Sequence, residues 1–186
     1  CDQEVYMKYN KILAKIEPGS ASRDDLAKLR SRALEKYAAG DIEAKEVLDA
    51  IDVATPSDNY IVFMGFCPGA DFDNRQDIEW REKGICRFDY IDSTHQLKRF
   101  NSIYPGDLIV LKKRHTFGKS MKLYGHGRVE KIQYDEANVR FLKVNWSGQT
   151  DVIEVPLMGA NSTVDIKLMA LVNKEMPESF FQWLAS

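Results

Sequence analysis

The sequence predicts an α+β protein in which a helical N-terminal segment precedes a small, partly open β-barrel with flanking helices. Two observations support this class. Residues 1–57 repeat apolar side chains at helical spacing. From Asn59 onward, short β-branched and aromatic runs alternate with Gly, Pro, Asn and Asp, which is typical of β-rich domains. Because the stretch 55–58 reads as a linker, we expect two parts, residues 1–57 and residues 58–186.

Three helices are expected in the first part. The first ends at Pro18-Gly19. The second begins at Ser22, which forms a capping-box-like pair with Asp25, and Gly40 ends it. The third begins after Asp41. Their apolar faces carry Val5, Tyr6, Tyr9, Ile12, Leu13 and Ile16, then Leu26, Leu29, Ala33, Leu34 and Tyr37, then Ile42, Val47, Leu48 and Ile51.

Six strands and two further helices are expected in the second part. The strands lie at 60–66, 84–90, 107–112, 123–133, 139–146 and 152–155. The helices lie at 95–101 and 177–184. The segment 68–79 reads as a long loop, of a length at which loops are often functional.

Composition narrows the class of protein. The 186 residues are 44% hydrophobic, which suits one domain with an appendage. No apolar run approaches the roughly 18 residues of a membrane span, so we expect no membrane partner. The cysteines Cys1, Cys67 and Cys86 are odd in number and lack paired spacing, which favours the reducing cytoplasm and no metal site. Because the chain begins without Met, we expect a trimmed fragment of a larger protein.

Two stretches of the β-rich part carry Gly at informative positions. Pro105 and Gly106 set a turn into an apolar strand, and we expect Asp107 to cap that turn. Further on, Gly125 and Gly127 interrupt the apolar strand 123–133. Glycine in a strand permits either a bend or the close approach of a ligand to the backbone, and both interpretations stay open.

Basic side chains gather between these two strands. No acidic residue occurs from Lys112 to Arg128, although the whole chain has a net charge of -2. Phosphate binding needs such a local concentration of positive charge, whereas a solvated hairpin is the structural alternative. We favour phosphate binding by Lys112, Lys113, Arg114, Lys119 and Lys122.

A second group of residues surrounds Trp80. The neighbouring Arg81 and Lys83 lead toward Phe88, and aromatic side chains beside basic ones suit a stacked base. A core position for Trp80 is the alternative. Trp146, in contrast, is expected to pack in the core.

Residues suited to catalysis are sparse. The acidic residues Asp71, Asp73, Asp77 and Glu79 alternate as metal ligands can, but they lack the glycine and terminal glutamate of an EF-hand. A G-x-S-x-G nucleophile motif is absent from the sequence. We therefore expect no enzyme activity, no metal and no cofactor.

Several of these segments together, over about residues 59–170, are similar to the PUA-like superfamily. The similarity is to its EVE-like branch, the DNA-reading domains attached to modification-dependent restriction motors. It rests on the strand at 60–66, Trp80 with Gly84-Ile85, Tyr104-Pro105-Gly106-Asp107-Leu108, Gly125-His126-Gly127-Arg128-Val129, Val144-Asn145-Trp146 and the segment 161–168. The acidic loop 71–74 and the basic hairpin depart from the commoner EVE pattern, so the resemblance does not identify the modified base.

The resemblance implies a pocket for a base that has swung out of the duplex. Its predicted lining comprises Trp80, Phe88, Asn101, Ser102, Tyr124, Gly125, His126 and Gly127. Stacking would come from Trp80 and Phe88, and hydrogen bonds from Asn101, Ser102 and Tyr124. Phosphates would be held by the basic hairpin residues together with Arg81 and Lys83.

The sequence therefore predicts a DNA-binding specificity module that reads a flipped or modified base, for example a methylated one, for a restriction or antiviral defence system. A motor or nuclease would then reside outside this chain. Two alternatives stay open: an RNA-binding PUA-like domain acting on tRNA or rRNA, and a protein-interaction scaffold.

Overall fold

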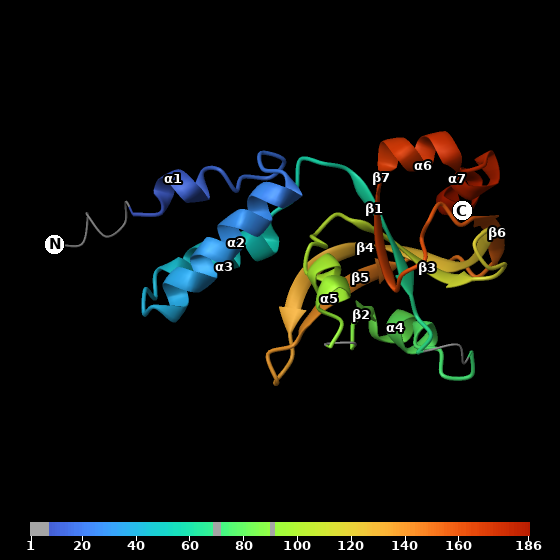
Figure 1. Ribbon diagram of the computed structural model, residues 1–186, viewed down its shortest axis with the longest axis horizontal. Helices are drawn as coiled ribbons and strands as arrows, with labels where there is room; N and C mark the ends of the chain where they lie inside the picture. Colours follow the sequence, from blue (N-terminus) through green and yellow to red (C-terminus); the bar gives the residue numbers. More distant parts are fainter. Residues whose placement is uncertain (1–7, 69–71, 90–91) are drawn as a thin grey trace. The chain divides into compact units, whose positions relative to one another are not determined.

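The computed structural model describes residues 8–68, 72–89 and 92–186 (Figure 1). The chain divides into two compact units, one ending at Asp58 and the other beginning at Asn59. Some predicted positions lie outside the described residues, namely Cys1, Val5, Tyr6, Asp71 and Tyr90.

The N-terminal unit is helical, as predicted. Its helices are α1 (Asn10–Leu13), α2 (Arg23–Ala38) and α3 (Ala44–Val53). The predicted capping box is confirmed, because the Asp25 N–H donates to Ser22 Oγ over 3.2 Å and the Asp25 carboxylate accepts from the Ser22 backbone. Gly40 follows α2 with a φ of 94°, a conformation that glycine adopts readily. The first helix is shorter than its apolar pattern predicts.

The second unit contains a seven-stranded sheet, so the predicted α+β class is confirmed. Its strands are β1 (Tyr60–Gly65), β2 (Ile85–Cys86), β3 (Leu108–Arg114), β4 (Ser120–Tyr134), β5 (Arg140–Trp146), β6 (Ile153–Pro156) and β7 (Val164–Leu168). They pair in the order β2-β5-β4-β3-β1-β7, and β6 pairs with β4 beside the hairpin turn. Within the described residues no pairing joins β2 to β7, so the sheet is open.

Helices cover both faces of this sheet (Figure 1). On one side lie α4 (Asp77–Lys83) and α5 (Thr94–Phe100), and on the other lie α6 (Met169–Glu175) and α7 (Glu178–Ala185). Each face has its own group of buried side chains. Trp80 of α4 and Phe100 of α5 belong to the first core cluster, and Val172 of α6 and Phe180 of α7 belong to the second. None of the described helices has the length and apolar character needed to cross a bilayer.

Strand β4 contains a bulge that decides which side chains face which cluster. Leu111 pairs with Gly125 and Lys112 with Leu123, so Tyr124 is the extra residue. Leu123, before the bulge, belongs to the second core cluster. Tyr124 packs against the first cluster. Val129, six residues after Leu123, would face the same side in a regular strand, yet it belongs to the first cluster. The bulge therefore reverses which face the following side chains of β4 point to.

Some elements differ from the sequence predictions. Residues 77–83 form helix α4, where the sequence suggested a loop followed by a strand entrance, and the following strand shrinks to Ile85–Cys86. The helix places Asp77 and Glu79 in its first turn and Arg81 and Lys83 in its last, which suits the helix dipole. Gly84 ends it in the left-handed conformation. Helix α6 and strand β7 were not predicted.

Candidate nucleic-acid interface

A small pocket lies on the arms of the β3–β4 hairpin. Its volume is about 170 Å³, and its lining comprises Phe72, Lys113, Arg114, His115, Lys122 and Tyr124. We call it the hairpin pocket. All four basic side chains lie on the hairpin, and two of them, Lys113 and Lys122, are partners across its strands. Tyr124 comes from the bulge, and Phe72 comes from the segment before α4.

Aromatic side chains form one wall of the hairpin pocket. The ring of Tyr124 lies 5.0 Å from that of Phe66 and 5.7 Å from that of Phe72, measured between centroids. The rings of Phe66 and Phe72 meet edge to face at 6.4 Å. Such contacts stabilise an aromatic cluster beyond its buried area, so the wall is held in place before any ligand arrives.

A partly buried ion pair between Arg75 and Asp77 contacts this wall. Arg75 Nε donates to Asp77 Oδ1 over 2.6 Å, and a second nitrogen of the guanidinium group bonds to Oδ2. The guanidinium carbon lies 4.7 Å from the Phe72 ring centroid and 5.3 Å from that of Tyr124. Asp77 neutralises the charge of Arg75, so Arg75 orders the aromatic rings. The positive charge available to bind an anion therefore comes from other residues.

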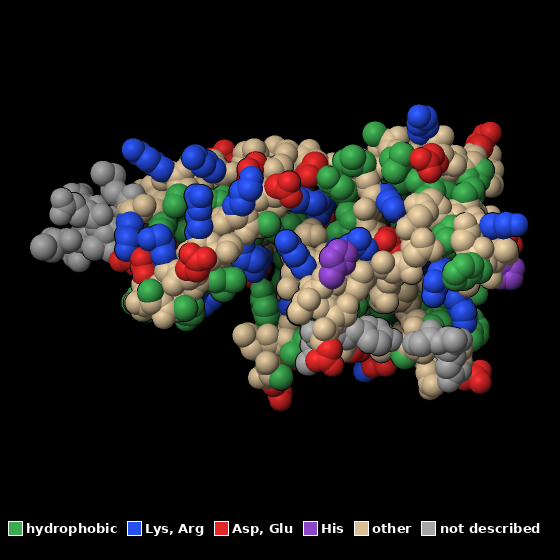
Figure 2. Space-filling view, viewed as in Figure 1, with side chains coloured by type: hydrophobic (Ala, Val, Ile, Leu, Met, Phe, Trp, Pro, Cys, Tyr) green, Lys and Arg blue, Asp and Glu red, His purple; other side chains and the backbone are tan. Residues whose placement is uncertain are grey.

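Several cations of the hairpin lack a carboxylate partner among the described residues. Lys113 Nζ lies 4.4 Å from the Phe72 ring centroid. Within the described residues, no ion pair involves Lys113, Arg114, Lys119 or Lys122. In Figure 2, Lys, Arg and His side chains lie beside apolar ones at the end of the β-rich unit where β6 lies in Figure 1.

One carboxylate lies close to these cations. Glu154 of β6 accepts a hydrogen bond from Ser120 Oγ over 2.6 Å. Its other oxygen lies 3.7 Å from His115 Nε2. The hairpin is therefore less purely basic than its own sequence suggests.

The pocket suits an anion that carries a flat group. The phenol of Tyr124 is protonated at neutral pH and keeps a hydroxyl donor, and partial burial raises its pKa further. The basic side chains match phosphate oxygens and the aromatic rings match a base. At about 170 Å³ the pocket is smaller than the roughly 300–1,000 Å³ of a drug-sized ligand site. It therefore fits part of an extended ligand better than a whole small molecule.

Among the predicted phosphate contacts, Lys112 requires correction. Its side chain is buried, and its ammonium group donates to Asp165 Oδ2 over 3.0 Å, to the Ser162 carbonyl over 2.6 Å and to the Ala160 carbonyl. Burial lowers the pKa of Lys112, while Asp165 opposes the shift. Lys112 thus anchors the segment before β7 and does not present its charge to a phosphate.

Arg81 and Lys83 also lie away from the hairpin pocket lining. Arg81 donates to the carbonyl oxygens of Tyr124, Ser147 and Gln149, the last over 2.7 Å, so it ties α4 to β4 and the chain after β5. Lys83 pairs with Glu79 one helical turn earlier over 2.6 Å. Neither residue lines the hairpin pocket.

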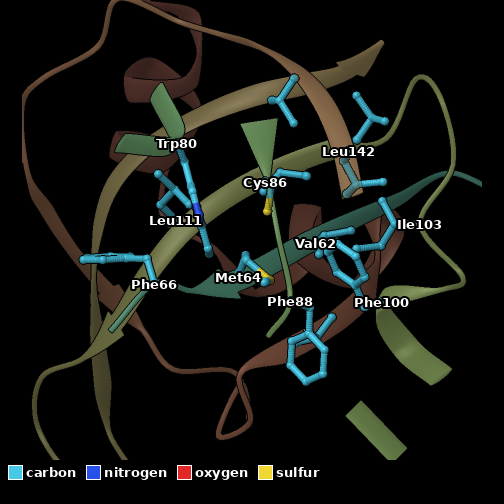
Figure 3. Packing of buried hydrophobic residues seen from close by; sticks show 14 residues of the cluster. Val62, Met64, Phe66, Trp80, Cys86, Phe88, Phe100, Ile103, Leu111 and Leu142 are labelled. Carbon is cyan, nitrogen blue, oxygen red and sulfur yellow. The ribbon is translucent and has the colours of Figure 1, made fainter. Parts of the chain in front are cut away.

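The predicted stacking residues lie in the core. Trp80 is 3% exposed, and in Figure 3 its side chain points into the first core cluster beside Leu111. Phe88 is equally buried and stacks on Phe100 with a centroid distance of 5.8 Å. Trp80 therefore takes its alternative role as a core anchor, and the stacking role predicted for Phe88 is wrong because that side chain is also buried in the core.

Gly125 and Gly127 were predicted to let a base approach the backbone, but packing within the protein explains both glycines. A Cβ at Gly127 would lie 2.7 Å from the Asn145 carbonyl oxygen, and one at Gly125 would lie 3.4 Å from Arg81 Nη1. The space that each glycine leaves is thus occupied by the protein itself, and no ligand is needed to explain it.

Two of the predicted hydrogen-bonding residues stand apart from the hairpin. Asn101 ends α5, and Ser102 Oγ donates to the Arg99 carbonyl over 2.8 Å. Neither lines the hairpin pocket. Of the predicted base-pocket residues, Tyr124 alone joins the basic side chains there.

His126 lines a different cavity, of about 410 Å³, together with Gly127, Trp146 and residues of α6 and α7. It is 8% exposed, and its ring meets the Trp183 ring edge to face at 4.9 Å. Burial lowers the pKa of His126, and a hydrogen bond with the Trp183 backbone opposes this effect. Its Nε2 atom is buried and has no hydrogen-bond partner in the part of the chain that the structure describes.

Three residues of the interface were not predicted as site residues, namely Phe72, Arg75 and His115. Phe72 and Arg75 lie in the segment that reads as a long loop, and the signal was an aromatic and a basic residue within it. His115 lay inside the basic run but was not assigned a role.

Comparison of the chain with models of protein families, with curated proteins and with solved structures finds no match. Within the described ranges, no group of three His, Cys, Asp or Glu side chains is arranged to hold a metal ion.

Proposed function

We propose that this protein is a nucleic-acid-binding module that uses the hairpin pocket. The observation that carries this proposal is the convergence of Lys113, Arg114, His115 and Lys122 with Phe72 and Tyr124 in one pocket. Cations hold phosphates in position without reading sequence. An adjacent aromatic wall adds stacking on a base, which every base offers and a free phosphate ion does not.

The proposed ligand is DNA that presents a flipped or modified base, in keeping with the resemblance to EVE-like domains. On this proposal the open sheet and its covering helices form a PUA-like domain, although Trp80 and Phe88 are replaced by Phe72 and Tyr124 as its stacking residues. The protein would act in the cytoplasm as the specificity module of a restriction or defence system whose motor or nuclease is carried elsewhere.

The test is the salt dependence of binding. Exchange of Lys113, Arg114 and Lys122 for Gln removes three cations from the pocket. If each contacts one phosphate of a duplex, the slope of log K against log salt falls by about 0.9 per contact, or about 2.7 in all. Fluorescence anisotropy of a labelled DNA duplex, repeated at several salt concentrations, measures this slope.

A matched control removes three cations elsewhere in the same unit. Lys98, Lys131 and Lys174 are exposed and lie outside the hairpin pocket, so their exchange for Gln changes the net charge equally. We expect this control to retain nearly the whole slope. Equal slopes in the two triple variants would show that binding depends on overall charge, and would contradict the proposal.

A panel of plain and modified DNA and RNA duplexes distinguishes the ligand. Preference for modified DNA supports the base-reading role, whereas a preference for RNA assigns the module to the RNA-binding alternative. If the unaltered protein binds none of these duplexes at low salt, the proposed function is wrong.

A further inference from the structure

An aromatic side chain stands exposed at the tip of the β3–β4 hairpin. Phe117 is 88% exposed, more than any other large apolar side chain in the described residues. Its ring has no role in either core cluster. Exposure of so large an apolar group is unfavourable in water, so a partner that covers this ring would gain binding free energy.

The hairpin turn holds Phe117 in a defined place. The His115 N–H donates to the Ser120 carbonyl over 3.0 Å, and the N–H groups of Lys119 and Ser120 both donate to the Thr116 carbonyl, over 3.0 and 3.1 Å. Gly118 supports the turn with a φ of 70°. A Cβ at Gly118 would meet nothing within 4 Å, so the tip projects away from the remaining described structure.

Charge around the tip indicates the kind of partner. Arg114, His115 and Lys119 are all exposed and lie within three residues of Phe117 along the chain. An apolar ring flanked in sequence by cations is complementary to a polyanion with an apolar interior, and stacked bases behind phosphates have that arrangement. A bilayer with anionic lipids is the main competitor. The adjacent hairpin pocket favours a nucleic acid, because its Phe72 and Tyr124 rings suit a stacked base and a lipid headgroup region offers none.

The tip follows directly on residues that line the hairpin pocket. Arg114 and His115 line the hairpin pocket and also lead directly into the turn that carries Phe117. A nucleic acid whose phosphates contact the pocket therefore passes next to the exposed ring.

We infer that Phe117 is a wedge that inserts between neighbouring bases of the bound nucleic acid. Apolar side chains of this kind unstack a base step and stabilise a kinked or opened duplex. In this protein the ring would occupy the space left in the stack when a base moves toward the Phe72–Tyr124 wall. The inference rests on the proposed function, because it requires a nucleic acid on the hairpin.

The test separates insertion from binding. A DNA duplex that carries 2-aminopurine beside a mismatch reports unstacking as a rise in fluorescence, and an end label reports binding by anisotropy. The unaltered protein should give both signals. Phe117→Ala should bind about 5- to 150-fold more weakly, the equivalent of one lost stacking contact, and should give no rise in fluorescence even at saturation.

Two further variants serve as controls. Phe117→Trp keeps an aromatic wedge and should restore the 2-aminopurine signal. Tyr134→Ala removes a 42% exposed aromatic residue near the β4–β5 turn, beside the acidic Asp135 and Glu136. This variant should match the unaltered protein in both signals.

The outcomes are distinguishable. If Phe117→Ala retains the salt slope, affinity and fluorescence rise of the unaltered protein, the wedge is wrong and the proposed function stands. If the unaltered protein ignores DNA but sediments with phosphatidylserine vesicles in a Phe117-dependent manner, the partner is a membrane and both proposals fail. A Phe117→Ala variant that loses the fluorescence rise but keeps the salt slope supports the wedge.

Discussion

Gly127 offers a direct test of the packing explanation for the glycines of β4. An added Cβ at Gly127 would lie 2.7 Å from the Asn145 carbonyl oxygen, 2.8 Å from Trp146 Cε3 and 2.8 Å from Val144 Cγ1. Carbon atoms pack best at about 3.5–4.0 Å. Because one of the three neighbours is backbone of the paired strand β5, relief requires movement of the sheet itself.

The expected cost follows from these distances. Overpacking a core commonly costs up to about 3 kcal/mol, and replacing Gly by Ala returns about 0.4–1 kcal/mol through the unfolded chain. We therefore expect Gly127→Ala to lower the free energy of unfolding by about 2 kcal/mol. Gly125→Ala is the matched control, because its Cβ would meet only the Arg81 guanidinium, at an ordinary contact distance of 3.4 Å. We expect that change to stay within about 1 kcal/mol of zero.

Urea unfolding followed by tryptophan fluorescence measures both changes. All three tryptophans, Trp80, Trp146 and Trp183, lie in the β-rich unit, so the signal reports that unit separately from the N-terminal helices. A shift of the midpoint at constant slope indicates a change in stability. The packing explanation is refuted if Gly127→Ala unfolds at the same urea concentration as the unaltered protein, or if Gly125→Ala proves the more damaging change.

Two further predictions concern buried side chains. Trp80→Ala should cost about 3–5 kcal/mol of stability, as for other large-to-small core changes, and the folded variant should bind nucleic acid as before; unchanged thermal melting would contradict the core assignment. His126 has a folded pKa below its unfolded value of about 6.5, so its contribution to stability is fully present above that pH and is lost as the pH falls toward the folded pKa. As the pH falls from 7.5 to 5, the urea midpoint should decrease less for His126→Gln than for the unaltered protein or for a His115→Gln control. Parallel curves of midpoint against pH would show that His126 is not the group responsible for the loss of stability.

Local signals predicted the elements whose formation depends on nearby residues. The Ser22–Asp25 capping box and the stop at Gly40 were readable because their partners lie a few residues apart. The turn before β3 was readable for the same reason, and the structure confirms that the Asp107 carboxylate accepts from the Tyr104 N–H over 2.7 Å. Helix α4 had comparable signals, but the tryptophan and basic residues within it drew a functional interpretation instead.

Features that depend on distant partners could not be predicted in this way. Lys112 belongs to a basic run, yet its buried role depends on Asp165 of β7. Glu154 reaches the hairpin only because β6 pairs with β4. The bulge at Tyr124 shifts the strand alternation, so the predicted base-pocket residues Tyr124 and His126 line two separate cavities.

Strand β6, which pairs with the β3–β4 hairpin, reduces the entropy cost of binding a partner at the hairpin tip. An isolated two-stranded hairpin is marginally stable in water, but β6 pairs with Ser120–Leu123 on the edge of β4 that β3 leaves free. The segment leading to Phe117 is therefore ordered when the protein folds. Ordering a loop at the moment of binding reduces affinity, and a preorganised loop avoids much of that cost. Any partner of this tip would thus meet a surface already fixed in its binding conformation.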